Sequence, residues 1–233
     1  MNLHYHPEFS ESEPILSGPE AHHAINVLRR QPGDILHITN GRGTRFECSI
    51  LSVKKTECRL SVTSITHSER QPEGIHLAVG ILKTADRMEW LVEKVTEIGA
   101  TSITFLRTEK TERGTINRER LTRSAISAIK QSGRIWLPDI RGPLNIADVL
   151  EQAPACRFIA SAGHKEAGRL IDLAPKTGEV LMLIGPEGDF SALEFNHAIA
   201  HGFMPVSLGP ATLRSETAAM VAAAAINMAR GRG

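Results

Sequence analysis

Two stretches near the C-terminal end decide the fold: Gly185-Pro186-Glu187-Gly188-Asp189-Phe190, and Leu208-Gly209-Pro210-Ala211-Thr212-Leu213-Arg214-Ser215-Glu216-Thr217-Ala218. The first ends an apolar run that starts at Val180, and the second opens the last predicted helix. In both, a β-type run stops at a loop of glycine and proline and a helix follows. Open α/β sheets bind ligands at such places, beyond the ends of their strands. An ordinary strand-to-helix turn would explain either loop alone, but the pair indicates ligand-binding loops.

The composition is that of an ordinary globular protein. Hydrophobic residues make up 41% of the 233 residues, which is enough for a real core in one or two domains. The 27 basic and 26 acidic residues leave a net charge of +1, so any nucleic-acid binding must come from a local patch. No run approaches the ~20 apolar residues that span a bilayer, and the chain does not open with an apolar signal core. Export and membrane anchoring are therefore not expected.

Neither the cysteines nor the histidines form a recognisable metal motif. The cysteines are odd in number and widely spaced, without a Cys-x-x-Cys pair: Cys48, Cys58 and Cys156. This spacing argues against a disulfide framework and a zinc site, and it fits a reducing cytoplasm. His197 and His201 lie four residues apart, but the glutamate of the zinc-protease motif is missing between them. We interpret these two as surface histidines and the adjacent His22 and His23 as structural, so no metal is expected.

The first 70 residues predict a small β-rich domain. Apolar residues at helical spacing indicate one short helix over residues 19–30. Short β-rich pieces separated by turn residues follow it, at 35–38, 45–53 and 58–65. The polar segment 67–73, which contains Pro72, is the expected linker. The predicted domains are therefore residues 1–70 and 74–233.

From about residue 74, strands and helices alternate. Strands are predicted at 75–82, 102–107, 157–160, 180–184 and 205–208. Helices are predicted at 84–98, 117–132, 146–152 and 191–201, with a terminal helix after the last loop. This alternation indicates a mostly parallel sheet with helices on both faces. Ser191-Ala192-Leu193-Glu194 is a capping-box sequence at the start of one helix. Neither a Gly-x-Gly-x-x-Gly after the first strand nor a P-loop sequence occurs, so the nicotinamide and NTPase interpretations are unsupported.

The two C-terminal loops resemble the S-adenosylmethionine-binding motifs of the SPOUT methyltransferases, specifically the RsmE family of 16S rRNA uridine N3-methyltransferases. That family's loops look like G-P-E-G-G-F and L-G-x-R-I-L-R-x-E-T-A. Three positions depart from the pattern: Asp189 replaces a glycine, Ala211 an arginine and Thr212 an isoleucine. The segments 83–87 and 93–99 also look like family sequences, K-x-D-R and Q-K-x-T-E-L-G, so the resemblance spans most of the chain.

The resemblance implies an α/β protein with a PUA-like RNA-binding β-barrel at residues 1–70. A SPOUT-type methyltransferase domain with a trefoil knot would occupy residues 74–233. It also implies S-adenosylmethionine as cofactor, 16S rRNA or the small ribosomal subunit as partner, and a cytoplasmic homodimer. Two alternatives stay open, because the departures could mark changed substrate choice or lost activity. One is a methyltransferase of the same fold acting on another RNA site, and the other is a non-catalytic RNA-binding relative.

The resemblance places the cofactor against both loops and their apolar walls, at Leu183, Gly185, Pro186, Glu187, Gly188, Leu208, Gly209 and Leu213. Arg214 is the predicted electrostatic catalyst, because a guanidinium can stabilise the negative charge of a uridine that loses its N3 proton. Glu216 is expected to hold Arg214 in place. Glu187 or Glu216 could instead take the proton, and Arg214 could form only a capping or interface salt bridge.

Basic residues matching family positions are the RNA-contact candidates: Arg29, Arg30, Arg113 and Arg134. A solvated charged surface is the alternative for all of them. Lys130 stands where the family usually has glutamate. Residues 218–226 are apolar on every face of the terminal helix, which predicts burial on every face and a dimer interface, with burial inside one subunit as the alternative.

Overall fold

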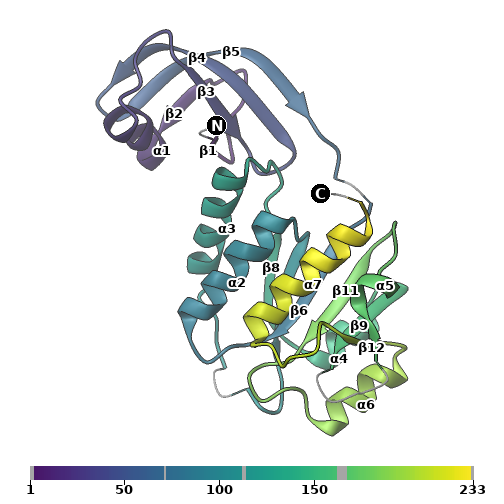
Figure 1. Cartoon of the computed structure of the whole chain (residues 1–233). Helices are drawn as coiled ribbons and strands as arrows, with labels where there is room; N and C mark the ends of the chain where they lie inside the picture. Colours follow the sequence, from purple (N-terminus) through teal and green to yellow (C-terminus); the bar gives the residue numbers. More distant parts are fainter. Residues whose placement is uncertain (1–2, 71, 112–113, 162–166, 232–233) are drawn as a thin grey trace. The chain divides into compact units, whose positions relative to one another are not determined.

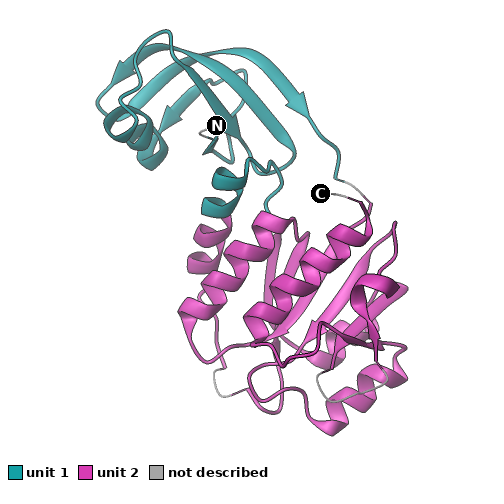
Figure 2. Ribbon diagram, in the orientation of Figure 1, with its two compact units in different colours: residues 1–70, 126–137 teal, residues 71–125, 138–233 magenta. Residues whose placement is uncertain are grey.

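The computed structural model describes residues 3–70, 72–111, 114–161 and 167–231 (Figure 1). The chain divides into two compact units, residues 1–70 with 126–137 and residues 71–125 with 138–233 (Figure 2). Helix α3 (Arg118–Ser132) contributes to both. The domain limits expected from the sequence, 1–70 and 74–233, stay a proposal, because the packing adds residues 126–137 to the first unit.

The first unit is a five-stranded sheet in the order β1-β3-β4-β5-β2. Its strands are β1 (Leu3–Tyr5), β2 (Ile15–Ser17), β3 (Ile35–Thr39), β4 (Thr44–Lys54) and β5 (Glu57–His67). The three predicted strands are confirmed as the antiparallel series β3-β4-β5. β1, which pairs parallel to β3, and β2 were not predicted, since three residues are too few to show an alternating pattern.

One helical segment packs on the core of this sheet. It consists of α1 (Gly18–His22) followed directly by the π-helical turn η1 (His23–Val27), so the helix predicted to Arg30 ends earlier. Ala21 and Ala24 lie in the core with alternate residues of β4 such as Cys48. Burial raises the pKa of the Cys48 thiol to about 12, which keeps it protonated and unreactive.

The second unit contains a seven-stranded sheet in the order β10-β12-β9-β11-β6-β7-β8. Its strands are β6 (Ile75–Gly80), β7 (Ser102–Arg107), β8 (Asp139–Asn145), β9 (Cys156–Ala160), β10 (Gly168–Arg169), β11 (Val180–Ile184) and β12 (Met204–Ser207). Every neighbouring pair is parallel, which confirms the predicted α/β class. β8 was missed because Gly142 and Pro143 interrupt its pattern.

Helices cover both faces of this sheet. They are α2 (Ala85–Ile98), α4 (Ile146–Glu151), α5 (Leu170–Leu173), α6 (Ala192–Ala200) and α7 (Ser215–Ala229), together with the first part of α3. All residues of β11 are buried. Leu181 and Leu183 pack in a core with Leu150 of α4 and Ala198 of α6. On the other face, α7 packs on β6 and β11 and lies beside α2 (Figure 1).

Local sequence signals set the helix ends that matter for the loops. Ser191 Oγ accepts a hydrogen bond from the Glu194 backbone N–H at 3.2 Å, and the Glu194 carboxylate accepts one from the Ser191 N–H at 2.8 Å. The predicted capping box is therefore confirmed. Among the described helices, none has the length and apolar character needed to cross a bilayer. The trefoil knot stays a prediction.

Candidate cofactor and active site

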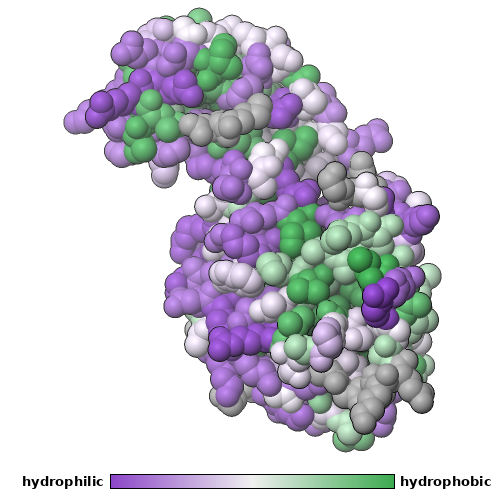
Figure 3. All heavy atoms as spheres, viewed as in Figure 1, coloured by the Kyte–Doolittle hydropathy of each residue, from purple (hydrophilic) through white to green (hydrophobic). Residues whose placement is uncertain are grey.

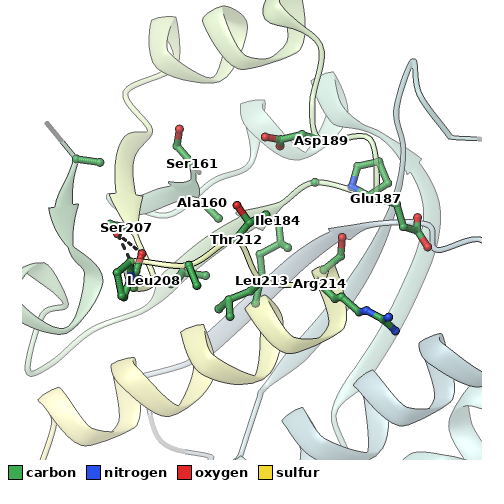
Figure 4. Close-up of a pocket in the computed structure, with 18 of the residues that line it drawn as sticks. Ala160, Ser161, Ile184, Glu187, Asp189, Ser207, Leu208, Thr212, Leu213 and Arg214 are labelled. Carbon is green, nitrogen blue, oxygen red and sulfur yellow. Dashed lines mark hydrogen bonds between the residues drawn. The ribbon is translucent and has the colours of Figure 1, made fainter. Parts of the chain in front are cut away.

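A cavity of about 750 Å³ lies in the second unit, where β9, β11 and β12 end. Its walls come from the loop after β11, the loop that runs from β12 into α7, and the end of β9 (Figure 4). Clefts for small molecules are commonly about 300–1,000 Å³. The carboxyl ends of parallel strands point toward one edge of a sheet, so the two signature loops meet there although 17 residues (191–207) separate them.

Most of the predicted cofactor residues line this cavity: Gly185, Pro186, Glu187, Leu208, Gly209 and Leu213. Leu183 does not, because adjacent strand residues point to opposite faces and Leu183 is buried in the core with α4 and α6. Its neighbour Ile184 forms the apolar wall instead. Gly188 also lies outside the lining, and its carbonyl oxygen accepts a hydrogen bond from Lys110 Nζ at 2.7 Å.

The loop after β11 depends on a glycine that the sequence did not single out. A Cβ added to Gly80, the last residue of β6, would lie 2.4 Å from Cδ and 2.5 Å from the backbone N of Pro186. Only a residue without a side chain allows this approach. The absence of a side chain at Gly80 therefore lets Pro186 sit where it closes one wall of the cavity.

Asp189 occupies a backbone conformation that suits glycine. Its φ is 59°, in the left-handed region, where the family pattern has glycine. Asp189 Oδ1 accepts a hydrogen bond from the Phe190 N–H at 2.8 Å, a local contact that helps an aspartate adopt this region. The Asp189 side chain belongs to the cavity lining (Figure 4), so this departure from the family adds a carboxylate to the site.

Arg87 joins the elements around the cavity and itself belongs to the lining, although no motif in the sequence gave it a role. Its Nε donates to Glu216 Oε1 at 2.9 Å, and its NH2 group donates to Glu216 Oε2. Its NH1 group donates to Glu187 Oε1, which also accepts from the Lys83 N–H at 3.1 Å. One guanidinium thus connects α2, the loop after β11 and the start of α7. The only hint in the sequence was the K-x-D-R resemblance at 83–87.

The expected role of Glu216 is therefore corrected. Its carboxylate holds Arg87 and not Arg214, although the Arg214 charge still acts on it. Burial is the largest single influence and would raise the pKa of Glu216, but the hydrogen bonds and charge of Arg87, a backbone hydrogen bond and the charge of Arg214 together hold the pKa below its ordinary value. Glu216 is consequently ionised at neutral pH and engaged at both oxygens, which makes it a poor acceptor for a substrate proton.

Arg214 lies at the cavity as an exposed, permanently charged group. It occupies the N-cap position of α7 without a side-chain capping bond. Among the described residues, its side chain takes part in no hydrogen bond or ion pair. A capping role is therefore unsupported, and the guanidinium is available to a ligand.

The predicted RNA-contact residues that the structure describes belong to the first unit. Arg29 is exposed, with φ of 54°, and the Arg30 guanidinium lies 3.9 Å from the Asp34 carboxylate. Burial lowers the pKa of Arg134. Arg113 lies outside the described residues. The RNA-binding role of these four arginines stays a prediction.

Comparison with known proteins points to one family. The family model for an RNA methyltransferase domain matches residues 69–227, and the model for an RNA methyltransferase PUA domain matches residues 16–63. Ribosomal RNA small subunit methyltransferase E of Synechocystis is 30% identical over 224 residues, with 93% of this chain and 73% of the relative covered. The Bacillus subtilis protein of the same name is 28% identical, with 91% and 88% covered.

Solved structures agree over nearly the whole chain. A probable rRNA-methyltransferase from Porphyromonas gingivalis has a TM-score of 0.91 at 39% identity, with 99% of both chains covered. A putative methyltransferase from Legionella pneumophila, solved with bound S-adenosylmethionine, has a TM-score of 0.84 at 32% identity, with 98% of this chain and 97% of that one covered. The chain belongs to the RNA methyltransferase family of ribosomal RNA small subunit methyltransferase E.

Proposed function

We propose that this protein transfers a methyl group from S-adenosylmethionine to N3 of a uridine in 16S rRNA. The observation that carries the proposal is the cavity at the ends of β9, β11 and β12, which is built from the two loops that match the family's cofactor motifs. A relative of the same fold at 32% identity holds S-adenosylmethionine. The names of the curated relatives supply the substrate class, which is small-subunit ribosomal RNA.

The cavity suits this cofactor in both size and chemistry. Ile184, Leu208 and Leu213 offer apolar surface for a flat base, and the glycine and proline residues of the loops expose backbone polar groups. The carboxylates of Glu187 and Asp189 add polar partners at the same cavity. When bound, S-adenosylmethionine supplies an activated methyl group on its sulfonium, so the transfer needs no metal.

The residues of this chain then have to orient the uridine and stabilise its charge. A uridine that loses its N3 proton gains negative charge on the carbonyl oxygens beside N3. The free guanidinium of Arg214 interacts more strongly with the negatively charged uridine than with the neutral one, so it stabilises the deprotonated base. Arg87 and Glu216 fix the start of α7, which carries Arg214. Because Glu216 is engaged by Arg87, we do not assign it as the base.

The remaining parts of the proposal concern RNA and location. The PUA domain, proposed at residues 1–70, would bind RNA through phosphate contacts of Arg29 and Arg30, together with Arg113 and Arg134 from further along the chain. The names of the relatives indicate action on ribosomal RNA, which supports a cytoplasmic location.

A homodimer is also proposed, with α7 at its interface. One face of α7 is completely buried, at Ala219, Ala222, Ala223 and Ile226. The opposite face is also apolar, yet Val221 and Ala225 are only half-buried and Met228 is 64% exposed. Within one subunit, residues 218–226 are thus not fully buried on every face, which supports a surface that a second copy covers. Figure 3 shows hydrophobic residues gathered over this part of the second unit, a surface that a second copy could cover.

Methyl transfer to ribosomal RNA tests the proposal. The protein is incubated with labelled S-adenosylmethionine and either small subunits or free 16S rRNA from cells that lack the modification, and the nucleosides are identified by mass spectrometry. N3-methyluridine is expected. A different methylated nucleoside would contradict the proposed target and favour the same fold acting at another RNA site. If calorimetry detects cofactor binding but neither substrate gains a methyl group, the non-catalytic alternative is favoured.

A further inference from the structure

Three potential metal ligands lie close together in the first unit. They are too far apart in the sequence to form a recognisable metal-binding motif. They are His4 of β1, Glu20 of α1 and His23 of η1. Each offers one ligand atom, and these atoms all lie within 4.8 Å of one another. His4 Nδ1 and Glu20 Oε2 are already 3.0 Å apart. The cluster lies outside the cofactor cavity, whose lining residues all belong to the second unit.

Two imidazole nitrogens of the cluster are buried without a hydrogen-bond partner among the described residues. They are Nε2 of His4 and Nδ1 of His23. The His4 side chain is only 1% exposed. A metal held between His4 Nδ1 and Glu20 leaves His4 Nε2 on the far side of the ring, so the orphaned nitrogen that calls for a ligand in this cluster is His23 Nδ1.

Two imidazoles and one carboxylate are a donor set typical of zinc and related divalent metals. Ligand atoms around a tetrahedral zinc ion are roughly 3.3 Å apart, as follows from metal–ligand bonds of about 2.05 Å. The His4 Nδ1–Glu20 Oε2 distance of 3.0 Å is close to this separation, and the ligand atoms of the cluster all lie within 4.8 Å of one another. We propose that His4, Glu20 and His23 bind a divalent transition metal of the Zn²⁺ class, with the fourth position taken by water.

Lys130 orients the Glu20 carboxylate of this site. Its ammonium group binds Glu20 Oε1, which leaves Oε2 directed to His4. Such an outer partner orients a metal ligand, but its positive charge also repels a divalent cation. The lysine therefore makes the metal affinity of this chain weaker than its donor set alone would give.

The bound metal acts on structure and not on methyl transfer. It ties the first strand of the sheet to the helical segment that packs on the core, two elements that residues 6–14 and strand β2 separate along the chain. A ligand that binds only the folded state raises stability with its concentration. The thermal unfolding midpoint of the first unit therefore rises as Zn²⁺ is added.

The test uses the full-length, untagged protein freed of metal by a chelator. Zn²⁺ is titrated in competition with a chromophoric chelator, and Co²⁺ is titrated with visible absorption as the readout. One bound ion per chain is expected, with a cobalt spectrum typical of a four-coordinate nitrogen–oxygen site. His23→Ala should weaken binding at least tenfold, and Lys130→Met should tighten it several-fold because the competing charge is removed.

Two neighbouring positions supply matched controls. His22→Ala changes the exposed histidine next to the cluster, and His197→Ala removes one member of the surface pair His197–His201, whose rings lie 4.5 Å apart. Neither substitution should change the affinity for the first Zn²⁺ ion. Circular dichroism checks that each variant is folded, and His23→Gln replaces His23→Ala if the alanine variant is not. The proposal is overturned if no Zn²⁺ binds at micromolar protein, or if binding depends on His197 and not on His23.

Discussion

Arg87 of α2 and Glu216 of α7 form a two-point hydrogen-bonded ion pair across 129 positions of sequence, with Nε and Oε1 2.9 Å apart. The two side chains are only 24% and 10% exposed. Paired contacts of this kind fix geometry as well as contributing energy. Because the same guanidinium reaches Glu187, the pair sets the positions of both cofactor loops and of Arg214.

Arg87 lines the cavity and binds Glu187 of one loop, so its replacement should damage the cofactor site. In Arg87→Met, the mostly buried Glu216 carboxylate loses its partner, which costs about 1–3 kcal/mol of unfolding free energy. Cofactor binding, measured by calorimetry, should weaken by about tenfold, a loss of the same size as one hydrogen bond to a charged group. Arg87→Lys keeps the charge but not the two-point geometry, so its stability and cofactor affinity should lie between those of the wild type and of Arg87→Met. Wild-type affinity and stability in Arg87→Met would show that the pair has no positioning role.

The pH dependence of the unfolding free energy should reveal the contribution of the Arg87–Glu216 ion pair. Burial would raise the pKa of Glu216, but Arg87, with a backbone hydrogen bond and the Arg214 charge, holds it below the ordinary 4.5, so the folded state binds fewer protons there than the unfolded state. The stabilisation is then fully present above about pH 4.5 and is lost as the pH falls through the lowered folded-state pKa. Urea unfolding of wild type and Arg87→Met should give a free-energy difference that is constant near neutrality and shrinks in acid. A difference that does not change with pH would assign the effect to packing alone.

Arg214→Ala should lower the rate of methyl transfer while leaving cofactor binding nearly unchanged. The variant is expected to lower methyl transfer by about a hundredfold or more, the scale for loss of one preorganised charge-stabilising donor. Cofactor affinity should stay within a few-fold, because the loops and their apolar walls are intact. Dimerisation and the circular dichroism spectrum serve as controls. Near wild-type transfer, or inactivity that comes only from unfolding, would remove Arg214 from the proposed catalytic role.

Gly80→Ala should disturb the cofactor loop from the neighbouring strand. The new Cβ would meet the Pro186 backbone N at 2.5 Å, so the backbone of the loop must move. We expect a loss of about 1–3 kcal/mol in stability, as for other overpacked sites, together with weaker cofactor binding. Gly114→Ala is the matched control, since a Cβ there meets no atom within 4 Å. Equal behaviour of the two variants in thermal unfolding and calorimetry would contradict the close approach.

A charge on the outer face of α7 should dissociate the proposed homodimer. Met228 is 64% exposed at this face, and Met228→Glu would place a carboxylate in an apolar interface. Sedimentation should show dimer for the wild type and monomer for the variant at micromolar concentration. Leu193→Glu on α6, where Leu193 is 74% exposed, should leave the dimer intact. A monomeric wild type would disprove the dimer, and a dimeric Met228→Glu would exclude this face.

The sequence by itself determined what depends on near neighbours along the chain. Periodicity and turn residues predicted the strand 102–107 with the observed ends, the alternation of strands and helices, and the capping box at Ser191. The two motif loops predicted the place of the cavity, because parallel strands bring their carboxyl ends to one edge. The resemblance to the family named the cofactor, and a relative's structure supports it.

Only the tertiary structure decided which distant side chains meet. It paired Glu216 with Arg87 and placed Ile184, not Leu183, at the cavity, because the strand order sets which face of β11 each helix covers. It also joined His4 to Glu20 through the short strand β1, whose three residues carry no periodic signal. Contacts of this kind arise when separate elements dock, and no local pattern of residues records which elements will become neighbours.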